Sequence, residues 1–265
     1  MSIVHLDKET AIKKISSKCS EALQQALKGN LIHFASDVSL DFGLVRPEKM
    51  NYEEDKQYEL LHSLIEKCGG WNKFPKRDAS VIASTLKTPA DRKHNVYVVL
   101  PVNGARIAVC SEDDFYTSFD HIEKQFKVKQ AKEFEDQLRI LCEAVNHFIH
   151  EKPMESFSNT DLITVCKTFD NIMKAFKGSY EFKTFYRTTT KQDFSRWENN
   201  NPLYEKIIEA MDPELNGFEL VTLKEIGSFK KREVWFNTEC YIISKQLFSE
   251  IIDSGKLAHI IEDVK

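Results

Sequence analysis

Residues 95–110 read NVYVVLPVNGARIAVC, and this stretch decides how the first half of the chain is expected to fold. Two apolar runs flank Asn103-Gly104, a strong hairpin signal because a type I′ turn requires a positive φ at both central residues. A two-residue loop places Leu100 opposite Ile107. Both faces of such a hairpin are largely apolar, so the stretch predicts a central buried β-hairpin in a sheet covered on both sides.

Outside this stretch, apolar spacing, capping residues and turn signals predict mixed helices and short strands. The expected helices span residues 8–28, 51–67, 130–151, 158–177, 202–211 and 244–255, with another after a capping box at 111–114; the expected strands span 31–34, 39–45, 181–189, 218–223, 233–236 and 240–243. Because their order is irregular, the sequence predicts an α+β fold. We expect two closely packed subdomains, residues 1–152 around the hairpin and a smaller one at 153–265.

Composition restricts the class of protein more than its function. The chain has 265 residues, 42% apolar and 29% charged, which is typical of a folded globular protein. Its net charge of -4 argues against a dedicated nucleic-acid coat protein, although a local basic patch is compatible with it. The six cysteines show no C-x-x-C spacing and predict reduced thiols in the cytoplasm. The sequence contains no apolar run long enough to cross a membrane, so no membrane contact is expected.

The most basic window is residues 71–94, WNKFPKRDASVIASTLKTPADRKH, called here the basic segment. Cations neutralise acidic groups such as phosphates, and aromatic rings offer stacking surfaces, so this composition favours a contact surface for a protein or nucleic acid. The leading hypothesis is therefore a binding or regulatory protein. The candidate binding residues are Trp71, Lys73, Phe74, Lys76, Arg77, Arg92, Lys93 and Arg106. Alternatively, Trp71 and Phe74 lie in the core, and Arg106 pairs with an acid of 112–114.

An enzymatic alternative rests on residues 185–189, FYRTT, and on Glu239. The pattern resembles ADP-ribosyltransferases, which implies an NAD site with Arg187 on a strand and Glu239 as the late acid. Asn237 stands where that family usually has Glu or Gln. A threonine-rich edge strand explains the same residues without chemistry. A nuclease-like fold that uses the acids at 112–114 is the other enzymatic possibility.

No metal or cofactor site is expected. Cys142, Glu143, Asn146, His147 and His150 recur at helical spacing, but H-E-x-x-H is absent and a solvent-facing helix edge explains them. A thiol at 110 would gain reactivity from a following helix, whereas the acids at 112–114 oppose this, so an inert buried cysteine is expected. The sequence contains no P-loop, G-x-S-x-G or G-x-G-x-x-G motif.

Overall fold

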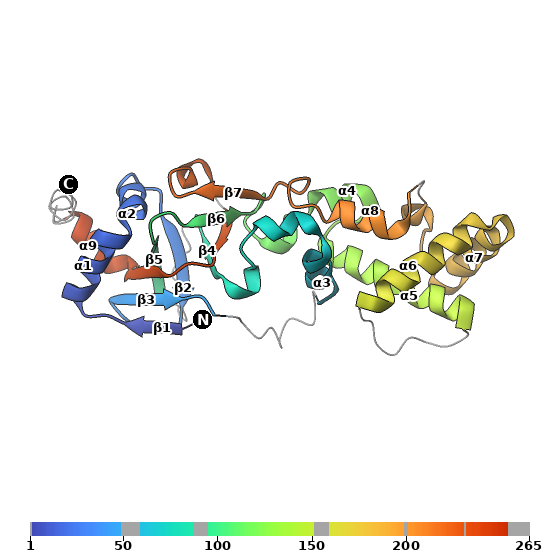
Figure 1. The fold of residues 1–265 in the computed structure, drawn as a ribbon, viewed down its shortest axis with the longest axis horizontal. Coiled ribbons are helices and arrows are strands. Elements are labelled where there is room, and N and C mark those ends of the chain that lie inside the picture. Colours follow the sequence, from blue (N-terminus) through green and yellow to red (C-terminus); the bar gives the residue numbers. More distant parts are fainter. Residues whose placement is uncertain are drawn as a thin grey trace. The chain divides into compact units, whose positions relative to one another are not determined.

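The computed structural model describes residues 2–48, 59–86, 95–150, 159–198, 201–230 and 232–253 (Figure 1). These residues form a nine-stranded antiparallel sheet and several helices, which confirms the expected α+β class. Within these ranges, no helix has the length and apolarity needed to cross a bilayer.

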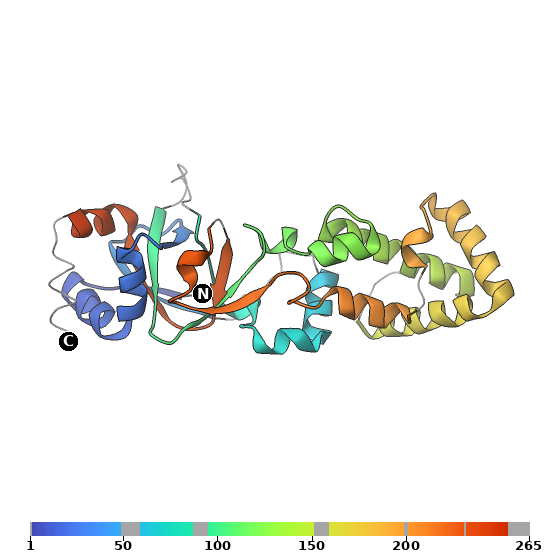
Figure 2. The same ribbon diagram turned by 90° about the horizontal axis from the view of Figure 1, so that it is seen from above.

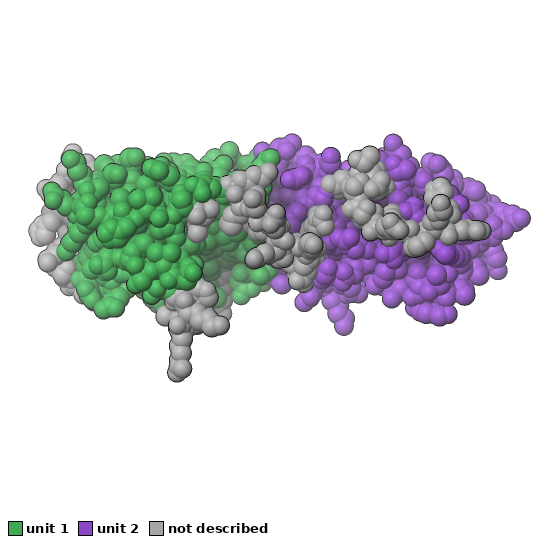
Figure 3. All heavy atoms as spheres, turned by 90° about the horizontal axis from the view of Figure 1, so that it is seen from below, with its two compact units in different colours: residues 1–52, 73–115, 218–265 green, residues 53–72, 116–217 purple. Residues whose placement is uncertain are grey.

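The chain divides into two compact units, coloured separately in Figure 3. Unit 1 comprises Met1–Tyr52, Lys73–Phe115 and Phe218–Lys265; unit 2 comprises Glu53–Asn72 and Tyr116–Gly217. Both units are therefore discontinuous in sequence. Each of the expected halves, 1–152 and 153–265, contributes to both units, so this division differs from the expected one.

Unit 1 contains the whole described sheet, in the order β1-β3-β9-β5-β2-β4-β8-β6-β7. Its strands are β1 (Ser2–His5), β2 (Ile32–Ser36), β3 (Phe42–Arg46), β4 (Val81–Ser84), β5 (Asn95–Pro101), β6 (Arg106–Val109), β7 (Glu219–Thr222), β8 (Glu233–Phe236) and β9 (Cys240–Ser244). Most coincide with expected strands, while β1 and β4 were not expected. All pairings are antiparallel, including those between strands far apart in sequence.

The expected central hairpin is wrong. β5 and β6 both form, but β5 pairs with β2 and β9, whereas β6 pairs with β7 and β8. The turn still closes, with the Ala105 N–H 3.1 Å from the Val102 carbonyl. Only Gly104 of its two central residues has a positive φ, +75°. That is the type II pattern, whose twist separates the flanking strands instead of pairing them.

The same turn fastens β5 to the N-terminal helices. The Asn103 N–H donates to the Lys18 carbonyl (2.6 Å), and the Asn103 side-chain oxygen accepts from the Glu21 N–H (3.0 Å). Asn103 thereby caps the first turn of α2 (Ser20–Leu27). The N-cap residue of that helix, Cys19, makes no side-chain capping bond of its own. The helix expected at 8–28 is thus two helices, α1 (Lys8–Lys18) and α2.

The order of the strands requires strong curvature. Three strands, β2, β4 and β8, separate β5 from β6 in the sheet. A flat sheet would hold β5 and β6 roughly 19 Å apart, at about 4.8 Å per strand, whereas a tight turn keeps its ends within about 7 Å. Helices α1, α2 and α9 (Lys245–Asp253) pack on this curved sheet and complete an apolar core (Figures 1 and 2).

Unit 2 is helical in its described residues. Its helices are α3 (Glu59–Lys67), α4 (Asp120–Phe126), α5 (Ala131–His150), α6 (Asn159–Lys174), α7 (Phe176–Thr190) and α8 (Leu203–Ala210). The strand expected at 181–189 is wrong, since these residues belong to α7. The helix is favoured because Phe182 and Tyr186, one turn apart, are both fully buried. Phe182 packs against Phe148 of α5 and Phe194, at centroid distances of 5.2 and 5.9 Å.

Candidate functional site

The two aromatic rings of the basic segment are packed. Trp71 is 8% exposed, and its indole N–H donates to the Met211 carbonyl over 2.8 Å. Its ring centroid lies 6.3 Å from that of Phe119. Phe74 is 7% exposed. Neither ring offers an open face on which a ligand stacks, which agrees with the alternative in which both lie in the core.

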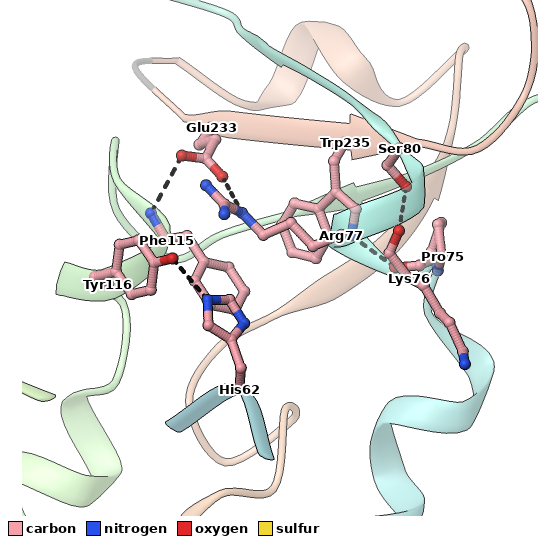
Figure 4. Close-up of polar contacts among 9 residues, drawn as sticks. All are labelled: His62, Pro75, Lys76, Arg77, Ser80, Phe115, Tyr116, Glu233 and Trp235. Carbon is pink, nitrogen blue, oxygen red and sulfur yellow. Dashed lines mark hydrogen bonds and ion pairs between the residues drawn. The ribbon is translucent and has the colours of Figure 1, made fainter. Parts of the chain in front are cut away.

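Arg77 is engaged in a compact cluster of unit 1 (Figure 4). Its Nε lies 3.0 Å from Glu233 Oε1, and the two side chains are only 14% and 13% exposed. The guanidinium carbon lies 4.7 Å from the centroid of the Phe115 ring, within cation–π range. The other oxygen of Glu233 accepts from the Phe115 N–H at 3.4 Å. Arg77 therefore has a structural role in β8 packing.

The backbone of the basic segment is held by the same cluster (Figure 4). The Trp235 indole N–H donates to the Pro75 carbonyl at 2.9 Å, and the Ser80 hydroxyl donates to the Lys76 carbonyl at 2.7 Å. The Trp235 ring also meets Phe115 edge-on, with centroids 5.6 Å apart. The chain between these contacts is consequently fixed in position.

The remaining cations of the prediction differ in their surroundings. Lys73 and Lys76 are exposed, and the Lys73 ammonium lies 5.9 Å from the Phe74 centroid. Arg92 and Lys93 lie outside the described residues. Arg106 is exposed at the start of β6, in register with Thr222 of the edge strand β7, and the described residues give it no acidic partner.

The two residues of the NAD-site hypothesis lie in different units. Arg187 is exposed on helix α7 of unit 2, so the strand arginine that the resemblance requires is missing. Glu239 follows β8 in unit 1 and pairs with Arg46 at 3.3 Å, with both side chains substantially exposed. The acids at 112–114 of the nuclease-like alternative are exposed at the surface.

The part of the chain that the structure describes contains no arrangement of side chains suited to metal binding or to thiol catalysis. No three His, Cys, Asp or Glu side chains gather there as a metal site. His147 instead stacks on Phe185, with ring centroids 5.6 Å apart. All six cysteines are buried, and none of them forms a disulfide bond. Burial raises the pKa of Cys19 and that of Cys166 to about 12, so neither is a ready nucleophile.

Two buried charges were missed because nothing local in the sequence marks them. Burial raises the pKa of Glu135, which is 1% exposed, although Arg139 and the Leu60 N–H bind one of its oxygens at 3.0 and 3.2 Å. Burial likewise lowers the pKa of Lys206. The Lys206 ammonium donates to the Arg196 carbonyl at 3.1 Å.

A third missed feature is an exposed face of α7, called here the α7 stripe. It consists of Phe176, Lys177, Tyr180, Thr184 and Arg187. These positions recur at three- and four-residue intervals, and so lie on one side of the helix. The expected strand at 181–189 hid this spacing, because a strand places alternate residues on opposite faces.

Comparisons with known proteins assign the chain to no family: no family model matches it, and no curated protein or solved structure is significantly similar.

Proposed function

We propose that the protein is a cytoplasmic binding protein with a regulatory role, which contacts another macromolecule through Lys73 and Lys76. The observation that carries the proposal is that both lysines are exposed on a stretch whose carbonyls at Pro75 and Lys76 are fixed by hydrogen bonds. All six of its cysteines are buried and none forms a disulfide, which supports a reducing compartment.

A fixed backbone favours binding because less conformational freedom is lost when a partner docks. Exposed lysines attract carboxylates or phosphates and increase the rate of encounter. Phe74 supports the surface from within, since it is buried and its ring centroid lies 5.9 Å from the Lys73 ammonium. The expected partner is therefore a protein with an acidic surface or a nucleic acid.

The test compares a Lys73→Glu/Lys76→Glu variant with the wild type after gentle purification at low and at high salt. Native mass spectrometry and absorbance at 260 and 280 nm identify what is bound. We expect the wild type to retain a partner at low salt and to release it at high salt, because the contact is electrostatic. The variant is expected to lose the partner under both conditions.

The control variant is Lys8→Glu/Lys13→Glu, which makes the same charge change at exposed positions of α1. Arg77 is left intact, because its replacement by Glu would place two carboxylates at the buried contact with Glu233. Partner binding that survives in the lysine variant and matches the control would refute the proposal. A bound small molecule of nucleotide mass would favour the enzymatic alternative instead.

A further inference from the structure

The α7 stripe carries the most exposed large apolar side chain described. Phe176 is 96% exposed and Tyr180 is 73% exposed, whereas the other large apolar residues with substantial exposure reach only 51%. The two rings stand one helical turn apart, about 6 Å along the axis. Both are exposed and lie away from the fully buried Phe182 around the helix. An exposed aromatic pair of this kind marks a contact site more often than a lone apolar residue does.

Cations accompany these rings on α7 and at its two ends. Lys177 and Arg187 belong to the stripe itself, while Lys174 and Lys191 are exposed at the end of α6 and just after α7. One acid borders the stripe, Glu181, which lies 3.6 Å from the Lys177 ammonium. Among the described residues, Lys174, Arg187 and Lys191 have no ion pair. The stripe thus combines stacking surfaces with unneutralised positive charge.

We propose that the α7 stripe binds single-stranded nucleic acid, with Phe176 and Tyr180 stacking on bases and Arg187 contacting phosphate. Bases present a flat π-face whatever the sequence, and phosphates supply the negative charge that neutralises the cations. The stripe contains no aliphatic residue, which distinguishes it from an apolar patch suited to a hydrophobic pocket. The stripe belongs to unit 2 and shares no residue with Lys73 and Lys76 of unit 1, so the inference does not rest on the function proposed above.

The test measures the fluorescence anisotropy of a labelled oligonucleotide of about 20 nucleotides, without secondary structure, as protein is added. We expect wild-type binding to weaken markedly between about 50 and 200 mM salt. A Phe176→Ala/Tyr180→Ala variant is expected to bind at least about tenfold more weakly, because both stacking faces are lost. Arg187→Gln is expected to reduce the salt dependence, because it removes one phosphate contact.

Matched controls separate stacking from general apolar contact. Phe176→Leu retains apolar area but lacks a π-face, and so should lose affinity, whereas Tyr180→Phe should keep it. Leu215→Ala and Lys124→Gln alter exposed side chains elsewhere in unit 2 and are expected to bind like the wild type. Because all these side chains are exposed, circular dichroism should show unchanged folding.

Three results would overturn the assignment: no binding of the oligonucleotide at low salt, equal binding by the double alanine variant, or full affinity in Phe176→Leu. Light scattering on the same samples identifies one competing use of the stripe. An oligomer that dissociates in the double alanine variant, without any effect of oligonucleotide, would show that the stripe contacts a second copy of the chain. The Lys73→Glu/Lys76→Glu variant tests only the surface formed by these two lysines. The failure of one proposal can therefore be told apart from the failure of the other.

Discussion

The contact between Arg77 and Glu233 is expected to contribute substantially to the stability of unit 1. The perturbation is a double-mutant cycle of Arg77→Met and Glu233→Gln. Methionine keeps much of the apolar stem that packs beneath the guanidinium, and glutamine keeps the shape of the carboxylate. Each single variant therefore removes charge while it preserves most of the volume.

The geometry sets the expected magnitude. Loss of one partner from a buried ion pair costs about 3–5 kcal/mol. Here the two side chains are 14% and 13% exposed, and Glu233 keeps the Phe115 N–H as a second donor, so part of the charge remains compensated. We expect Arg77→Met to lower the free energy of unfolding by about 2–3 kcal/mol, a value that includes the cation–π contact with Phe115.

The assay is urea denaturation of the four proteins, followed by circular dichroism and by tryptophan fluorescence. The pairwise coupling between the two positions should be about 1–3 kcal/mol. Arg77→Lys is expected to recover only part of the loss, because an ammonium lacks the planar guanidinium that covers the ring. A loss below about 0.5 kcal/mol for Arg77→Met, the size of an exposed pair, would refute the structural role of Arg77.

Three further variants test other contacts. Trp71→Phe leaves the buried Met211 carbonyl without its donor and should cost about 1–3 kcal/mol in thermal unfolding; an unchanged midpoint would contradict this role. Asn103→Ala removes the cap on α2 and should cost about 0.5–2 kcal/mol with faster hydrogen exchange in its first turn, whereas Asn103→Asp should retain the cap; equal exchange in both would count against it. Because the folded-state pKa of Glu135 is raised above 4.5, its contribution makes stability fall as the pH rises from about 4.5 through the folded pKa. Glu135→Gln should remove that fall, measured as the difference in melting temperature from the wild type across this range; parallel curves would exclude it.

Elements with a strong local signal were predictable. The strands expected at 218–223, 233–236 and 240–243 are confirmed as β7, β8 and β9, because compact apolar runs lie between turn residues. The helix expected at 130–151 is confirmed as α5, since its apolar stripe has an unbroken period of 3.6. In these cases the residues that decide the structure are close together in sequence.

Pairing partners were not predictable in this way. Asn103-Gly104 specifies that the chain turns, but which strands lie beside β5 depends on β2 and β9, which are distant in sequence. Residues 181–189 favour a strand by composition, because they are rich in threonine and aromatic residues. The competing signal was the four-residue spacing of Phe182 and Tyr186, which matches a helix packed on one face.

The candidate site shows the same limit. The sequence marks Arg77 as a cation near aromatic residues, but its partner Glu233 lies 156 residues further along the chain. Its charge is therefore compensated by a residue that no local pattern connects to it. The basic segment was predictable as a region of positive charge, whereas the division between buried anchors and exposed lysines depends on the tertiary fold.

The discontinuity of unit 1 has a consequence for synthesis of the chain. β5 cannot complete its pairing until β9 has been made, and β4 waits in the same way for β8. At about 5–20 residues per second, the delay between β5 and β9 is on the order of 10 s. Unpaired strand edges that persist for this time are templates for aggregation. All of unit 2 is translated before β8 and β9, so a helical unit is able to form while the sheet is still incomplete.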